Sequence, residues 1–433
     1  HCAGALRIGR VCRDLMDGEI SHASVLFDPD GSLATTHESQ GSDMGLMGGL
    51  LGWEATDRRL PEAKSHLGKN SIRVKFTIRD IGAVHPNTYQ LILNNPSGTC
   101  QVTALSVGGG MIEIIDIDRA KISLAGDYFE TLVYCQDPDL ILQQIKERVD
   151  HDDVSVHPGP DTIIEVKSQK FPDQAVLTDL LAMKEVRLIR KIRPVLPVLS
   201  RKSMELPFLS SQKMLEFNRD RGLALWELAL LYESLRGSIP EEEVYEKMRQ
   251  LAGYMEDAIS SGLNGTEYND RILGSQSPAF KTKMDQNQLL GGNLTNRIIM
   301  SVSAVMEVKS AMGLIVAAPT AGSCGTIPGA VLGIASGMGL SQDHVIKALL
   351  STGMIGIFIA RHATFAAESG GCQAECGAAS GMAAAGLVSL AGGSVEQSLA
   401  ASSLALQNSL GMICDPIANR VEAPCWAKIL WLP

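Results

Sequence analysis

KSAMGLIVAAPTAGSCGTIPGAVLGIASGMGLSQD, residues 309–343, is a run in which only the first and last residues carry a charge. A transmembrane hairpin is one interpretation of such a run, but a membrane span needs about 20 uninterrupted apolar residues. Pro319, Pro328 and several glycines interrupt this one. Helices that are apolar on all sides also occupy the centre of large helical domains. The run therefore predicts buried helices in the core of an all-α domain.

The flanking sequence of the C-terminal half supports this fold. Apolar residues recur at helical spacing over 217–237 and 240–263, and a polar stretch over 264–288 precedes the apolar helices. Prolines at 194, 197 and 207 predict a linker before this half. We therefore expect a large all-α catalytic domain over residues 207–433.

The N-terminal half has a mixed character. Residues 71–78, 88–95 and 111–117 are rich in β-branched residues and predict strands in an α+β domain over 1–130. Gly108–Gly110 mark either a hairpin turn or bulge, or a backbone loop that touches a ligand. Residues 131–200 then predict a β-α-β-β-α order, with a second helix over 174–189, as in a small ferredoxin-like regulatory module. The fold class is thus multidomain, α+β followed by all-α.

Composition and charge restrict the function. A net charge of −10 in 433 residues argues against nucleic-acid binding, which needs a basic patch. The opening HCAGALRIGRVC lacks the pattern of a secretory signal and also lacks a Met, so that the true N-terminus is expected to be missing. Nine cysteines in a chain of this size favour reduced thiols in a cytoplasmic protein.

Four cysteines lie in the last quarter of the chain. Cys372 and Cys376 are four residues apart in GGCQAECG. Cys414 is the first residue and Cys425 the last of the stretch CDPIANRVEAPC. None of them has CxxC spacing, so that they can be small buried residues or thiolates that hold a metal. Soft thiolate sulfur is the usual ligand of iron–sulfur clusters.

Several segments together resemble the iron–sulfur L-serine dehydratases. The resemblance rests on 370–386, 307–333 and 414–425, and in the N-terminal half on 1–10, 39–53 and HPNT (85–88) with SVGGGMIEI (106–114). It implies conversion of L-serine to pyruvate and ammonia without pyridoxal phosphate, in a homodimer. It further implies a [4Fe–4S] cluster held by Cys372, Cys414 and Cys425, with one open iron as Lewis acid. Cys376 is then a packing residue.

The resemblance also implies substrate-binding residues. It places His1 and the PTAGS segment, with Thr320, Gly322 and Ser323, near the substrate carboxylate, although a proline–glycine turn between helices is the simpler interpretation of PTAGS. Asp43 matches the last residue of the family's G-H-G-T-D stretch. These residues are expected to form the substrate site.

Three departures bear on activity. Gln40 stands where the family has the histidine of G-H-G-T-D, and an amide cannot transfer protons by titration. His37 is a candidate substitute, although it can equally be a solvated loop residue. Cys2 stands where the family has Thr, and the chain stops shortly after Cys425, where relatives continue, so that the helical domain is expected to be truncated.

Two other functions compete with an iron–sulfur lyase. A non-catalytic serine-binding descendant is motivated by Gln40. A pyridoxal phosphate lyase would need a Schiff-base lysine in a glycine-rich phosphate loop, and no lysine of the helical region has that setting: Lys281, Lys283, Lys309, Lys347. L-serine is the expected ligand, with neither nucleic acid nor membrane as partner.

Overall fold

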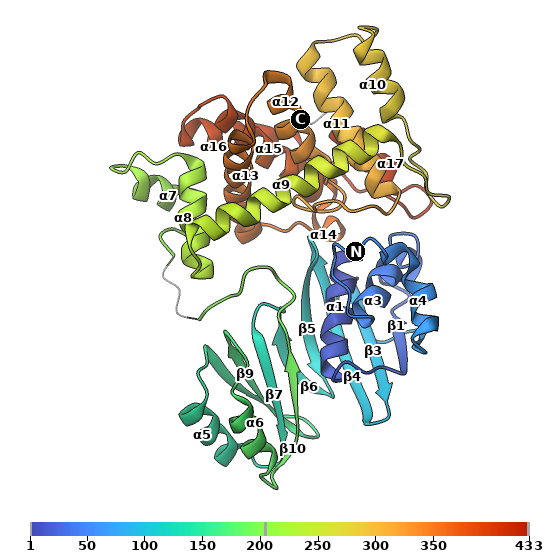
Figure 1. Ribbon diagram of the computed structural model, residues 1–433, viewed down its shortest axis with the longest axis vertical. Coiled ribbons are helices and arrows are strands. Elements are labelled where there is room, and N and C mark those ends of the chain that lie inside the picture. The colour runs from blue at the N-terminus through green and yellow to red at the C-terminus, as the bar shows by residue number, and fades with distance from the viewer. Residues whose placement is uncertain (1, 203–205, 431–433) are drawn as a thin grey trace. The chain divides into compact units, whose positions relative to one another are not determined.

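The chain forms two compact units, residues His1–Met204 and Glu205–Pro433. The structure is a computed structural model that describes residues 2–202 and 206–430. The first unit combines helices with two sheets, and the second is built of helices (Figure 1). The predicted fold class, α+β followed by all-α, is confirmed.

A six-stranded sheet is the centre of the first unit. Its order is β2-β1-β3-β4-β5-β6, with β1 and β2 parallel and the other pairs antiparallel. Helix α1 packs on α3 beside this sheet, and their apolar side chains share one core with it. The strands and helices are β1 (His22–Phe27), β2 (Arg73–Ile78), β3 (Thr88–Asn95), β4 (Gly98–Gly108), β5 (Met111–Ile117), β6 (Ala120–Leu124), α1 (Cys2–Leu15), α2 (Leu33–Thr36), α3 (Ser42–Leu50), η1 (Leu60–Glu62) and α4 (Ala63–Lys69).

The strands predicted in this unit are confirmed as β2, β3 and β5. Gly108–Gly110 lie at the hairpin between β4 and β5, and all three have positive φ, which favours glycine. The carbonyl of Gly110 accepts a hydrogen bond from Arg7 of α1 at 2.5 Å. The hairpin interpretation of the triple glycine is therefore confirmed.

A smaller antiparallel sheet completes the first unit, with the order β10-β7-β9-β8. Its elements are β7 (Phe129–Cys135), α5 (Pro138–Arg148), β8 (Asp153–His157), β9 (Thr162–Ser168), α6 (Gln174–Leu181) and β10 (Val186–Ile192). The predicted helix over 174–189 is wrong beyond residue 181. Val186–Ile192 instead pairs with β7, because its apolar residues complete the sheet's core. The β-α-β-β-α-β order is ferredoxin-like.

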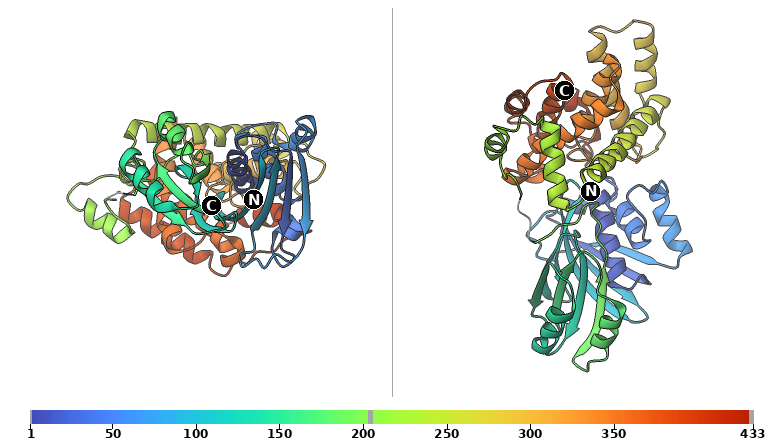
Figure 2. Two further views of the ribbon diagram at one scale, coloured as in Figure 1. Left: turned by 90° about the horizontal axis from the view of Figure 1, so that it is seen from below. Right: turned by 60° about the vertical axis from the view of Figure 1, so that its left-hand side comes forward.

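The second unit is built of helices packed against one another (Figures 1 and 2). Their buried apolar side chains form its cores. Its elements are α7 (Ser211–Asn218), α8 (Leu225–Gly237), α9 (Glu241–Asn264), α10 (Ser277–Asp285), α11 (Asn293–Ser310), η2 (Pro328–Leu332), α12 (Gly333–Met338), α13 (Gln342–His362), α14 (Ala367–Gly370), η3 (Gln373–Gly377), α15 (Ala378–Leu390), α16 (Val395–Asn408) and α17 (Glu422–Ile429). The long helix α9 confirms the helix predicted over 240–263. The helical pattern over 217–237 is instead divided between the end of α7 and the whole of α8.

The middle of the uncharged run, residues 322–333, is buried as predicted, whereas residues 311–317 are largely half-buried loop and residues 336–339 are exposed. Helix α11 ends at Ser310, and the run continues as a loop, the π-helical turn η2 and the short helix α12. The neighbouring α13 is long and apolar enough to cross a membrane by length and composition, but 56% of its most apolar window is buried inside the unit. This burial is typical of a core helix.

Small residues let the central helices approach closely. Helix α15 packs against both α13 and α16. A Cβ added to Gly386 of α15 would lie 2.6 Å from the Cγ2 atom of Thr352 in α13, too close for any larger side chain. The Ala/Gly/Ser-rich composition of α15 therefore has a packing reason.

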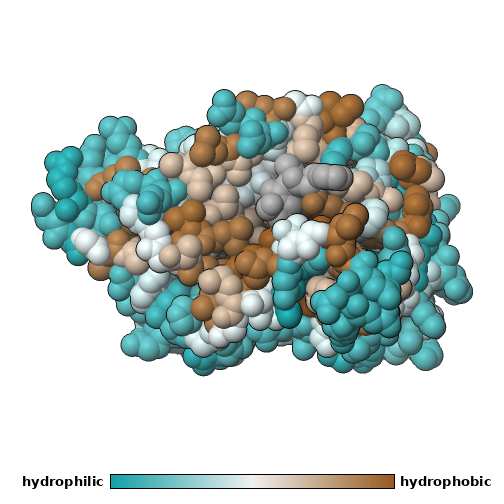
Figure 3. All heavy atoms as spheres, turned by 90° about the horizontal axis from the view of Figure 1, so that it is seen from above, coloured by the Kyte–Doolittle hydropathy of each residue, from teal (hydrophilic) through white to brown (hydrophobic). Residues whose placement is uncertain are grey.

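The surface of this unit is partly apolar. Figure 3 shows hydrophobic side chains gathered toward the centre of one face, with hydrophilic side chains around them. Large exposed hydrophobic side chains of the C-terminal region include Leu404, Leu410, Ile413 and Ile417.

Candidate active site

Three cysteine thiols meet in the core of the helical unit. The Sγ atoms of Cys372, Cys376 and Cys425 lie within 4.8 Å of one another. All three side chains are at most 3% exposed and belong to one apolar cluster with residues of α11 and α17. This is a group of soft donors from which water is excluded.

Local structure explains how these thiols meet. Cys372 precedes η3, and the wide π-helical turn brings the Sγ of Cys376 within 3.3 Å of the Sγ of Cys372. Cys425 lies in the first turns of α17, whose Trp426 Nε1 donates to Ser303 Oγ of α11 at 3.0 Å. Glu422, which begins α17, accepts hydrogen bonds from Ser310 Oγ and the Ile272 amide. Helix α17 is thus fixed to α11, with its thiol toward η3.

The three thiols titrate differently. Hydrogen bonds from Cys376 and Cys425 lower the pKa of Cys372 to about 4. The same bonds raise the pKa of Cys376 and of Cys425. Among the three, the pKa of Cys372 is the one that its neighbours lower, which makes it the thiol that most readily ionises to bind a soft metal.

Cys414 lies outside this group. It is exposed in the segment between α16 and α17, where Lys428 Nζ of α17 donates to the Ile413 carbonyl at 2.7 Å and pairs with Asp415. The structure therefore brings together two of the three cysteines that the resemblance implies, Cys372 and Cys425. The third thiol in the group is Cys376, which the resemblance assigned to packing.

The PTAGS segment forms a buried turn between α11 and η2. Thr320 and Ser323 are both buried, and their hydroxyl oxygens lie 3.2 Å apart. Ser323 Oγ also accepts a bond from the Thr320 amide at 3.4 Å. The hydroxyls that the resemblance places at the substrate carboxylate are thus held by the turn itself.

Glu375 connects the PTAGS turn to the thiols. It lies in η3 between Cys372 and Cys376, and hydrogen-bonds with the Thr320 side chain. A Cβ added to Gly322 would lie 2.8 Å from its Oε2 atom, so that only glycine allows this approach. Burial, followed by the nearby Cys425, raises the pKa of Glu375 to about 7. One buried region therefore contains both the predicted cluster ligands and the predicted substrate segment.

Lys309 is the charged residue at the start of the uncharged run. Its Nζ atom is buried and has no hydrogen-bond partner among the described residues. Burial raises the pKa of Cys324 and Glu375, and the Cys372 hydrogen bond raises that of Cys425; the charge of Lys309 opposes all three rises, which places its ammonium near these groups. Sequence reasoning considered Lys309 only as a Schiff-base lysine and did not single out Glu375. The signal was available, because Glu375 is a carboxylate between two cysteines in an otherwise small and uncharged segment.

The predicted residues of the first unit lie around α2 and α3. His37 Nδ1 is 2.8 Å from Asp43 Oδ1. The His37 ring packs against the rings of Phe27 and Phe76, with centroids 5.1 and 5.5 Å away. Gln40 lies in the turn before α3. His1 falls outside the described residues.

The comparison with known proteins gives the family. Residues 209–431 match the sequence family described as serine dehydratase alpha chain. This chain belongs to the serine dehydratase family. The match covers the whole helical unit that contains the thiol group, the PTAGS turn and Lys309.

Individual relatives agree with this assignment. The L-serine dehydratase alpha chain of Peptoniphilus asaccharolyticus is 36% identical over 219 residues, which cover 50% of this chain and 74% of the relative. The probable alpha chain of Bacillus subtilis is 33% identical over 218 residues, which cover 50% of this chain and 73% of the relative. The probable beta chain of B. subtilis is 36% identical over 137 residues, 32% of this chain and 61% of that relative. Sequence similar to separate alpha and beta chains is therefore present in a single chain here.

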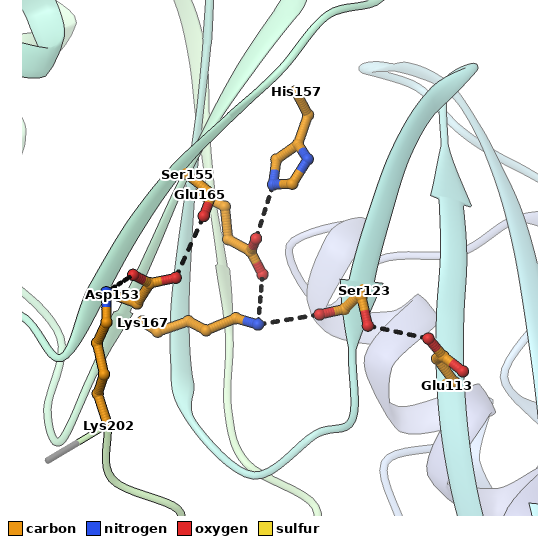
Figure 4. Close-up of polar contacts among 8 residues, drawn as sticks. All are labelled: Glu113, Ser123, Asp153, Ser155, His157, Glu165, Lys167 and Lys202. Carbon is orange, nitrogen blue, oxygen red and sulfur yellow. Dashed lines mark hydrogen bonds and ion pairs between the residues drawn. The ribbon is translucent and has the colours of Figure 1, made fainter.

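A second group of buried ionisable residues lies in the first unit, on the smaller sheet. Glu165 of β9 is 2% exposed and lies between His157 and Lys167, as Figure 4 shows. Its Oε2 is 2.7 Å from His157 Nε2, and its Oε1 is 3.3 Å from Lys167 Nζ. Lys167 also donates to the Ser123 carbonyl of β6 at 3.0 Å. This network joins the smaller sheet to the edge of the larger one.

Glu130 of β7 is the exception in this network. It is fully buried beside Glu165, and neither of its oxygens has a hydrogen-bond donor among the described residues. Burial and the negative charge of Glu165 raise its pKa well above the ordinary value. Glu130 therefore takes up a proton more readily than an ordinary glutamate.

Proposed function

We propose that this chain is an L-serine ammonia-lyase that converts L-serine to pyruvate and ammonia with a [4Fe–4S] cluster. The observation that carries the proposal is the buried thiol group of Cys372, Cys376 and Cys425 in the unit that matches the serine dehydratase alpha chain. Relatives that match this unit bear the name L-serine dehydratase. A cytoplasmic location and a homodimer stay predictions.

The donor set fits an iron–sulfur cluster. Thiolates are the usual protein ligands of such clusters, and the neighbouring thiols lower the pKa of Cys372. We propose Cys372, Cys414 and Cys425 as the three ligands, with Cys376 as a thiol that hydrogen-bonds to Cys372. Cys414 is proposed on the resemblance, because it is exposed and lies outside the group that the other thiols form. When bound, such a cluster supplies a Lewis acid for the substrate hydroxyl.

The protein residues bind the substrate and move its protons. The PTAGS turn offers the Thr320 and Ser323 hydroxyls to the serine carboxylate, in a core that excludes water. We propose His37 of the first unit as a candidate proton acceptor, because Asp43 at Nδ1 fixes the tautomer in which Nε2 accepts. Loss of the α-proton and the hydroxyl as water gives aminoacrylate. Its imine tautomer takes up water to release ammonia and pyruvate.

Anaerobic assay of pyruvate and ammonia tests this function. The protein is purified without air and mixed with L-serine, and the two products are expected in equal amounts. Treatment with borohydride should leave the rate unchanged, because no Schiff base takes part. Absence of both products from protein with a full iron complement would contradict the proposal.

A non-catalytic serine-binding protein is the second candidate, and Gln40 is the observation that favours it. This candidate predicts calorimetric binding of L-serine to protein with a full iron complement but no pyruvate. It also predicts that Gln40→His restores turnover. Pyruvate formation by the unaltered chain would exclude it.

A further inference from the structure

Two oppositely charged side chains face the same buried region beside the thiols. Lys309 leaves α11 one residue before the helix ends, and Glu375 belongs to η3. No ion pair between them is found among the described residues, although each is close enough to act on Cys425. The two side chains thus lie in one region, where the Lys309 charge acts on Glu375 without a direct ion pair between them.

A buried ammonium without a partner is costly. Burying a polar group without a hydrogen bond costs roughly 1–3 kcal/mol in proteins, and a charged group costs more. Lys309 Nζ has no partner among the described residues, so that nothing in this part of the chain offsets that cost. An anionic group bound next to Nζ would offset it, since charge-assisted hydrogen bonds are the stronger ones.

Glu375 has the complementary property. Its carboxyl lies directly over Gly322, where a Cβ would be 2.8 and 3.0 Å from its two oxygens. It is therefore held at the PTAGS turn, with the Thr320 side chain as a hydrogen-bond partner. A carboxylate accepts up to about four hydrogen bonds, which leaves capacity for an ammonium donor.

We propose that Lys309 and Glu375 recognise the two charged ends of a zwitterionic α-amino acid, Lys309 its carboxylate and Glu375 its ammonium. The inference rests on the proposed function and names the groups that select its substrate class. A ligand that lacks its amino group leaves Glu375 without a donor, and one that lacks its carboxylate leaves Lys309 without an acceptor. The pair therefore selects α-amino acids over hydroxy acids and amines of the same size.

Calorimetric binding to the intact, iron-loaded chain tests this selection without turnover. L-Alanine has both charged ends but no hydroxyl to lose, whereas propionate and ethylamine each lack one end. In the unaltered protein we expect L-alanine to bind at least about tenfold more tightly than either. Equal affinities for the three ligands would overturn the inference. This comparison needs no variant.

Variants assign each end to its residue. Lys309→Met should weaken L-alanine binding about 10- to 100-fold and leave ethylamine binding unchanged. Glu375→Gln should weaken L-alanine binding but leave propionate binding unchanged. Lys309→Arg should keep most of the affinity for L-alanine. Lys281→Met, an exposed lysine of α10, is the matched control and should change nothing.

Iron content and pyruvate formation separate the outcomes. A variant is compared with the unaltered chain only when both contain the same amount of iron. If a variant loses iron, the affinities of the unaltered chain for L-alanine, propionate and ethylamine decide instead. Pyruvate formation together with unselective binding would overturn the Lys309–Glu375 assignment alone. Absence of iron and pyruvate in the unaltered chain would instead contradict the proposed function. Loss of both propionate and ethylamine binding in Lys309→Met would show a structural role and also overturn the assignment.

Discussion

The two units bury their ionisable groups in different ways. In the first unit, Glu165 has His157 and Lys167 as partners, and Asp43 has His37. In the helical unit, Lys309 has no hydrogen-bond partner among the described residues, and the thiols of Cys372 and Cys376 interact mainly with other thiols. The first unit also buries a group without a hydrogen-bond partner, Glu130, but that carboxyl lies beside a second carboxyl, whereas Lys309 is a cation near soft thiols and offers binding capacity. The difference directs attention to the helical unit as the place of chemistry.

The strongest way to break this comparison is to remove a thiol. Cys372→Ser should abolish cluster binding, because it removes the thiolate of the group. Cys414→Ser should do the same, whereas Cys376→Ala should leave the cluster in place. Iron and sulfide analysis of anaerobically purified protein measures this. Similar iron contents for Cys372→Ser and Cys376→Ala would refute the division of roles.

The next largest effect, a loss of activity, is expected from the His37–Asp43 pair of the first unit. His37→Gln should lower kcat by about 10²–10⁴-fold, because the proposed proton acceptor is lost. The KM for L-serine should change little, and iron content should not change. His66→Gln, which removes a histidine that lies near Glu62, serves as control and should keep full activity. An unaltered kcat in His37→Gln would show that another group accepts the proton.

A single methyl group tests the contact between the PTAGS turn and η3. Gly322→Ala places a Cβ 2.8 Å from Glu375 Oε2 and must displace that carboxyl. We expect the KM for L-serine to rise about tenfold, because overpacking at this contact costs roughly 1–2 kcal/mol of binding free energy. Gly353→Ala in α13 is the matched control, since its Cβ would meet nothing within 4 Å. A KM equal to that of the control would contradict the contact.

The smallest effect is expected at Glu130, where removing a charge should stabilise the first unit. A glutamate titrates near pH ~4.3 in an unfolded chain, whereas burial raises the Glu130 pKa well above this in the folded state. Its contribution to stability is therefore fully present below that pH and is lost as the pH rises toward the folded pKa.

Glu130→Gln should remove this loss of folding stability at high pH, because glutamine does not ionise. At pH 8 the variant should be more stable by about 1–2 kcal/mol, a rise in Tm of a few degrees, and at pH 4 the difference should disappear. Thermal melts between pH 4 and 8 measure it, with the exposed Glu147→Gln as control. A lower Tm for Glu130→Gln at pH 8 would show that the carboxylate is stabilising after all.

Local sequence patterns predicted much of the fold. The strands β3 and β5 and the helix α9 carry their own periodicity, and the uncharged run before Asp343 indicated a buried helical core. The error at Val186–Ile192 has a tertiary cause. This segment follows a helix with similar apolar content, and only pairing with β7 makes it a strand.

The site was less predictable than the fold. Sequence resemblance selected Cys372 and Cys425, but the π-helical turn that brings Cys376 to Cys372 has no signal in residue spacing. Lys309 and Glu375 are 66 positions apart, and only the packing of η3 beside the PTAGS turn relates them. Roles that depend on contacts between distant segments cannot be predicted from local pattern.

The iron content of the intact chain is the most direct test of the central claim, that cysteines of the helical unit hold an iron–sulfur cluster. We predict about 4 irons and an equal amount of sulfide per chain in anaerobically purified protein, with a brown colour from absorption near ~400 nm. A colourless anaerobic preparation with fewer than about 2 irons per chain would contradict the claim.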